Sequence, residues 1–192
     1  MTSPGRCIAL FAAVLSCAGC WVRSVHPLHS PDSLATDDRI LGTWVAPDEK
    51  TSFTQPTDTF LVRRSGRLAY ALVYVTNGAP ASFEVHLTRL ADALFADVVP
   101  RPPDEAHGPG RLHLLPLHSF VRLSPTQDTM EVVPLDHEWL GVQLAGPRPA
   151  LAFTRLDDLL LLTAPTADLR RFIVARADDP KAFSHPVVLR RI

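Results

Sequence analysis

Residues 68–99 have the sequence LAYALVYVTNGAPASFEVHLTRLADALFADVV, and this stretch decides the fold class. The Asn77-Gly78 pair predicts a hairpin turn, because both residues tolerate the positive φ angles that tight turns between strands require. Between positions 83 and 88, apolar residues alternate with polar ones, which is typical of a strand with one buried face. A further turn at residues 91–93 leads into a third apolar run. The stretch therefore predicts consecutive antiparallel strands.

Strand-like runs of similar length continue on both sides of this stretch. We expect further strands at residues 41–45, 60–63, 112–121 and 130–134, and a second hairpin formed by residues 150–156 and 159–163. Short strands at regular spacing, separated by turn residues, predict an antiparallel meander, and such a meander can close into a barrel.

Two helices interrupt the strand pattern. Asp136 is an acid suited to a helix N-terminus, and it predicts a short helix that ends near Gly146. A second helix is predicted to begin with Thr166 as its cap, because Leu169 and Phe172 lie on one face at helical spacing. The apolar stripe of this C-terminal helix is expected to pack against the outside of the sheet.

Gly42-Thr43-Trp44 opens the first long strand-like run, and it resembles the Gly-x-Trp motif of the lipocalins, in which the indole closes one end of the barrel. The resemblance implies a mainly β fold in which the meander closes into a lipocalin-like barrel. The short internal helix and the C-terminal helix would then lie outside the barrel.

The composition limits the possible partners. The chain of 192 residues has 19 basic and 20 acidic residues, and this balance does not suggest a nucleic-acid partner. Its 3 cysteines all lie at or before position 20, so the rest of the chain has no cysteine pair for a disulfide. Stability must then come from packing, and residues 39–192 are predicted to form one domain with one core.

The first twenty residues have the features of a secretory leader. Arg6 supplies a positive charge, and an uncharged apolar run follows it and ends in small residues before Cys20. As a helix rising about 1.5 Å per residue, residues 7–19 would cover only about 20 Å, less than the roughly 30 Å of bilayer hydrocarbon. The sequence therefore predicts a signal peptide at residues 1–19 that is cleaved after export.

Residues 15–20, LSCAGC, resemble the lipobox of bacterial lipoproteins. The resemblance implies that the leader is cut just before a cysteine that becomes acylated, and several acyl chains give stable anchoring. Cys20 is the favoured site because small residues precede it, and Cys17 is the alternative. An ordinary signal peptide with an incidental cysteine is a further interpretation. Trp21 is not the aspartate that retains many lipoproteins at the inner membrane, which implies a periplasm-facing place on the outer membrane.

The segment after the anchor shows no sustained period, so residues 20–38 are predicted to form a lipidated, extended tether. Four segments of the chain together resemble a group of uncharacterised bacterial lipoproteins. These segments are residues 25–28 (VHPL), 41–44 (LGTW), 115–120 (LPLHSF) and 162–166 (LTAPT). This resemblance supports the expected address and implies no particular activity.

Common signatures of catalysis are missing from the sequence, among them a Gly-x-Ser-x-Gly elbow, a His-Glu-x-x-His motif and a phosphate loop. We therefore expect a non-catalytic binding or structural role in the cell envelope, without a cofactor. The barrel could hold a small apolar molecule or dock to an envelope protein. Candidate cavity residues are Trp44, Tyr70, Tyr74, Phe83 and Trp139. Alternatively, the indoles fill the core and donate their N–H groups to carbonyl oxygens.

A second hypothesis comes from the histidines. His113, His118, His137 and Glu138 could converge as metal ligands or as an acid–base pair in a periplasmic hydrolase, provided that the fold brings their two segments together. Otherwise His118 is a core or rim residue, and Asp136 with its neighbours simply caps a helix.

Overall fold

The computed structural model describes residues 22–46, 58–101, 115–157, 159–183 and 185–192. Eight antiparallel strands form a closed barrel. In chain order they are β3 (Gly42–Val45), β4 (Thr59–Arg64), β5 (Tyr70–Thr76), β6 (Ala79–Leu90), β7 (Ala93–Pro100), β8 (His118–Pro125), β9 (Thr129–Pro134) and β12 (Val187–Arg191). Each strand pairs with the next, and β12 pairs with both β9 and β3, which closes the barrel. The mainly β fold and the barrel are confirmed.

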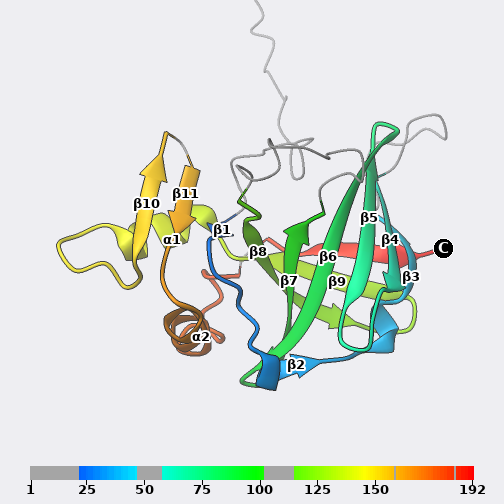
Figure 1. Ribbon diagram of the computed structural model, residues 1–192, viewed down its shortest axis with the longest axis horizontal. Helices are drawn as coiled ribbons and strands as arrows, with labels where there is room; N and C mark the ends of the chain where they lie inside the picture. The colour runs from blue at the N-terminus through cyan, green and yellow to red at the C-terminus, as the bar shows by residue number, and fades with distance from the viewer. Residues whose placement is uncertain (1–21, 47–57, 102–114, 158, 184) are drawn as a thin grey trace, which may run out of the picture.

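The segment between β9 and β12 lies on one side of the barrel (Figure 1). It consists of α1 (His137–Leu144), β10 (Phe153–Leu156), β11 (Leu159–Leu162) and α2 (Thr166–Val174). Leu169, Phe172 and Ile173 of α2 are buried in a core cluster that also contains Phe95 and Phe120 from the outer face of the barrel. The prediction that this helix packs outside the sheet is therefore correct. No helix in the described ranges is long and apolar enough to cross a bilayer.

Two details of the helices can be compared with the sequence. Asp136 is the N-cap of α1, as predicted, and its carboxylate accepts the Trp139 N–H at 2.8 Å. Thr166 is not the cap of α2, because Pro165 occupies that position. The Thr166 hydroxyl instead donates to the Pro27 carbonyl at 2.7 Å. The helix is also not the last element of the chain, since β12 follows it.

The turn that the sequence predicted most directly is present. Asn77 and Gly78 have φ angles of 50° and 77° and connect β5 to β6 with Thr76 opposite Ala79. In β5 and β6, inward residues such as Leu72 and Val85 alternate with outward ones, so the barrel has an apolar interior and a separate outer face. A single meander thus creates two apolar clusters, one inside the barrel and one between its outer wall and the helices.

Residues 22–38 are part of the folded body, so the prediction of an extended tether is wrong for this described segment. It contains β1 (Arg23–Ser24), a 3-10 turn (Pro31–Ser33) and β2 (Leu34–Ala35), and a second 3-10 turn (Asp38–Ile40) follows. β1 lies between β8 and β11, and β2 pairs with β6. Val22 and Leu28 are buried in the outer cluster. Burial of apolar side chains and backbone pairing hold this segment against the barrel, although its sequence has no periodic pattern.

Candidate functional site

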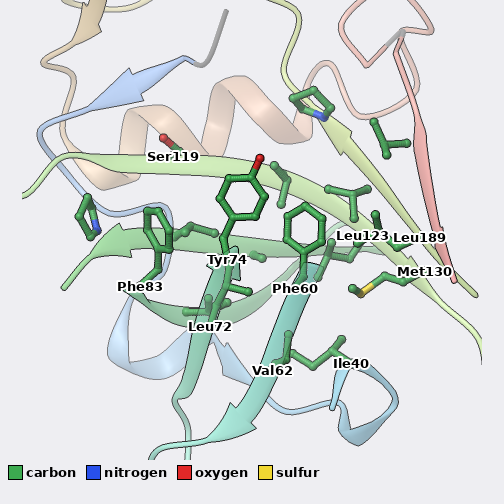
Figure 2. A pocket seen from close by; sticks show the side chains of 18 of the residues that line it. Ile40, Phe60, Val62, Leu72, Tyr74, Phe83, Ser119, Leu123, Met130 and Leu189 are labelled. Atoms are coloured by element: carbon green, nitrogen blue, oxygen red, sulfur yellow. The ribbon is translucent and has the colours of Figure 1, made fainter. Parts of the chain in front are cut away.

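The interior of the barrel contains a cavity of about 510 Å³. Its walls carry side chains from β4 to β9 and from β12, and most of these side chains are aliphatic or aromatic. The lining residues are Arg23, Ile40, Phe60, Val62, Leu72, Tyr74, Phe83, Val85, Ala96, Val98, Pro100, Leu115, Leu117, Ser119, Val121, Leu123, Met130, Val132, Pro134, Val187 and Leu189. Figure 2 shows labelled side chains from several of these strands around the cavity. Ligand pockets usually measure about 300–1,000 Å³, so this cavity is large enough for a small molecule.

The strand period places these side chains in the cavity. Phe60 and Val62 of β4 point inward, as do Leu72 and Tyr74 of β5, because every second residue of a strand faces the same side. The Phe60 and Tyr74 rings are stacked with their centroids 4.8 Å apart. The Tyr74 hydroxyl donates to the Asp58 carboxylate at 2.9 Å. Burial and the negative charge of Asp58 raise the pKa of Tyr74, so its hydroxyl stays protonated at neutral pH.

Two of the five residues predicted for a ligand cavity line this one. They are Tyr74 and Phe83. Trp44 and Tyr70 also point into the barrel, but both are fully buried in its packed core and do not line the cavity. Trp139 lies outside the barrel, where it packs against the outer cluster with its ring 5.9 Å from that of Phe172.

Polar contacts explain why Trp44 and Tyr70 belong to the solid part of the core. The Trp44 indole donates to the Ile40 carbonyl at 2.8 Å, and the Arg191 guanidinium lies 4.2 Å from the centre of the indole ring. The Asp37 N–H donates to the Tyr70 hydroxyl at 2.9 Å. Both side chains are thus fixed to the segment just before β3, and that segment packs over this part of the interior.

A second polar feature lies on the outer face of the barrel. Asp97 of β7 is only 1% exposed. One of its carboxylate oxygens accepts the Leu28 N–H at 2.6 Å and lies 2.9 Å from His29 Nδ1, while the other lies 2.6 Å from His118 Nδ1. His86 stacks on His29 with the ring centroids 4.4 Å apart. We call Asp97, His29 and His118 the carboxylate–imidazole cluster.

The charge of this cluster follows from its geometry. Burial disfavours the ionised form of Asp97, but the hydrogen bonds and charges of His118 and His29 outweigh this effect and lower the pKa of Asp97 to about 2. An ionised carboxylate can only accept hydrogen bonds, so Nδ1 of each of the two imidazoles must carry a proton. Burial lowers the pKa of the neighbouring His86, and His29 adds to this effect. The Asp97 carboxylate is therefore ionised at neutral pH and accepts a hydrogen bond from each imidazole.

The carboxylate–imidazole cluster fastens the N-terminal segment to the barrel. Leu28 and His29 come from this segment, while Asp97 and His118 belong to neighbouring barrel strands. Arg170 of α2 adds a hydrogen bond to the Leu28 carbonyl at 3.2 Å. Residues 25–28, 115–120 and 162–166 thus meet here, since each of these segments contributes a hydrogen bond to this contact. The arrangement serves attachment, because each carboxylate oxygen is occupied by protein donors.

The alternative metal or acid–base site is not assembled in the described part of the chain. His118 pairs with Asp97, whereas His137 and the exposed Glu138 lie in the first turn of α1. His113 lies outside the described residues. Among the described residues, no three histidine, cysteine or acidic side chains are grouped so that they could hold a metal ion. His137 Nε2 is buried and has no hydrogen-bond partner among the residues that the structure describes.

The sequence interpretation missed Asp97 and gave no role in the fold to His29. A signal for Asp97 was available, because this acid stands in an apolar run, with Phe95 and Ala96 before it and Val98 after it. A charge in such a run is buried in the folded chain and needs partners. The sequence gives no indication that the partners come from positions 28, 29 and 118.

Comparison with known proteins identifies no relative of this chain. No protein-family model, curated protein or solved structure matches the chain.

Proposed function

We propose that this chain is a lipid-anchored, non-catalytic protein of the bacterial outer membrane that faces the periplasm and binds one small apolar ligand inside its barrel. The observation that carries the proposal is the cavity of about 510 Å³ with an almost entirely apolar lining. Apolar surface of this extent is unfavourable in contact with water, and transfer of an apolar ligand into the cavity removes water from both surfaces. A closed barrel of eight strands has an interior wide enough for one such ligand.

Binding can be tested with an uncharged dye. N-phenyl-1-naphthylamine fluoresces strongly in apolar surroundings and weakly in water. We expect saturable fluorescence with about one dye molecule per chain and an increase in the melting temperature with dye concentration, because a ligand that binds only the folded state stabilises it. A linear, unsaturable signal and an unchanged melting temperature would contradict the ligand-binding proposal.

The proposed anchor rests on the leader and on the place where the folded body begins. Cys20 stands only three residues before Arg23, the first residue of β1. An acylated Cys20 would therefore hold the body directly against the bilayer surface.

The anchor is tested by mass spectrometry of the native N-terminus. We expect a mature chain that starts at Cys20 and carries the mass of attached acyl chains, because several chains are needed for stable anchoring. Cys20→Ala should release the protein from the membrane fraction, whereas Cys17→Ala should leave it anchored. Retention of the Cys20→Ala variant together with release of the Cys17→Ala variant would assign the lipid to Cys17, and an unacylated wild-type chain would refute the anchor.

A further inference from the structure

The part of the cavity wall that the structure describes includes one charged side chain. Among the described residues that line it, Arg23 is the only one with a charged side chain. Arg23 belongs to β1, where it lies opposite Ser119 of β8, and Ser119 also lines the cavity. A positive charge in an otherwise apolar lining suggests a ligand with a negative charge at one end.

The strand register places Arg23 at the rim of the barrel. β9 pairs with β8 from Val121 to Pro125, and this pairing ends where Pro134 lies opposite Val121. Beyond that point β1 pairs with β8, with Arg23 opposite Ser119, while β7 occupies the other edge of β8. β1 therefore continues the barrel wall past the end of β9. The cavity is apolar in its depth and cationic at this rim.

One acidic side chain also lies next to the lining. Asp58 accepts a hydrogen bond from the Tyr74 hydroxyl at 2.9 Å, but Asp58 is not itself a lining residue. Its negative charge disfavours an anionic group beside Tyr74, so an anionic headgroup is favoured on the Arg23 side of the rim. A guanidinium has five N–H donors in a planar fork, so Arg23 can bind such a headgroup in addition to its contacts within the protein.

We propose that the ligand of the barrel is an amphiphile whose acyl chain fills the cavity and whose anionic headgroup, a carboxylate or a phosphate, binds Arg23. This inference rests on the proposed ligand-binding function and adds the chemical class of the ligand. The anchor supports it, because three residues span at most about 11 Å and an acylated Cys20 would keep the Arg23 rim close to the lipid headgroups. The acyl chain can come from a free fatty acid or from an anionic phospholipid.

The headgroup is tested with two probes that share one chain. Cis-parinaric acid carries a carboxylate, and its methyl ester does not. The protein used is the full chain with the substitutions Cys17→Ala and Cys20→Ala. These substitutions remove both candidate lipidation sites, so binding can be measured by fluorescence without detergent. We expect the acid to bind about tenfold more tightly than the ester, because a charge-assisted hydrogen bond is lost with the ester. Arg23→Met should weaken binding of the acid alone and so make the two affinities equal. Arg148→Met, at an exposed position outside the lining, is the control and should leave the tenfold ratio of affinities unchanged.

The outcomes separate this inference from the function on which it rests. Equal affinities of acid and ester in the parent protein, or an unchanged ratio in Arg23→Met, would overturn the headgroup assignment while the uncharged naphthylamine dye still bound. Loss of binding for all three probes would overturn the ligand-binding function itself. Native mass spectrometry after incubation with vesicles of phosphatidylglycerol, or with palmitate, distinguishes the two sources by the mass that remains bound.

Discussion

Asp97→Asn should lower the free energy of unfolding by about 3–5 kcal/mol, because it removes one partner of a buried ionic contact. The asparagine keeps the shape of the side chain but removes the buried charge that accepts the Leu28 N–H and pairs with two imidazoles. An amide group also brings an N–H₂ donor, and this donor would face the protonated nitrogen of His29 or of His118. The N-terminal segment should consequently detach from the barrel.

Urea denaturation measures this effect against a matched control. Asp178→Asn makes the same chemical change at an exposed position, and we expect it to alter the free energy of unfolding by no more than about 0.5 kcal/mol. Amide hydrogen exchange should show lost protection of residues 22–38 in the Asp97→Asn variant alone. Similar unfolding midpoints for the two variants would show that the carboxylate–imidazole cluster contributes little to stability.

The acid dependence of stability gives a second test of Asp97. Its pKa is about 2 in the folded protein and 3.8 in a free side chain, so the folded state favours the ionised carboxylate. The resulting stabilisation is fully present above about pH 4 and disappears as the pH falls through 2. The stability difference between wild type and Asp97→Asn should therefore shrink by about 2 kcal/mol between pH 5 and pH 2. A constant difference over this range would contradict the ionisation assigned to Asp97.

Local sequence signals predicted most of the barrel, because its strands are consecutive and its turns are local. The Asn77-Gly78 hairpin and the alternation of residues 83–88 in β6 follow from neighbouring residues alone. β12 was not predicted, since Val187–Arg191 is short and ends in two arginines. Val187–Arg191 forms a strand because it pairs with β3 on one side and with β9 on the other, which closes the barrel. Both partners are far away in the sequence, so no local signal predicts this pairing.

The positions of the cavity residues depend even more on contacts between residues that are far apart in the sequence. Tyr70 and Tyr74 were both predicted to line a cavity, but the sequence could not show that only Tyr74 borders it. Tyr70 is enclosed because its hydroxyl meets the backbone of Asp37, which lies 33 positions earlier in the chain. Trp44 was a candidate for the cavity wall, with a place in the core as the alternative. The core position is the one found, because Arg191 and Ile40 hold the indole there.

Leu72→Trp should weaken binding of the uncharged naphthylamine dye while the barrel remains folded. Leu72 is a half-buried residue that points into the cavity from the middle of β5 (Figure 2), so the larger indole would occupy space that the proposed ligand needs. Overpacking is costly where a core is already dense, but here the indole enters an open cavity, and we expect a change in the free energy of unfolding of at most about 1 kcal/mol. The affinity for the dye should fall by about tenfold or more, because the clash opposes the ligand alone.

Val73→Trp is the matched control, since it adds an indole at the next residue of the same strand. Val73 faces the outside of the barrel and does not line the cavity, so dye binding should be unchanged. A fluorescence titration of both variants, together with their urea midpoints, separates blocked binding from unfolding. If Leu72→Trp stayed folded and bound the dye as tightly as Val73→Trp, the dye would have to bind elsewhere on the molecule. That result would contradict binding inside the barrel, because an indole in its wall reduces the space that the ligand needs.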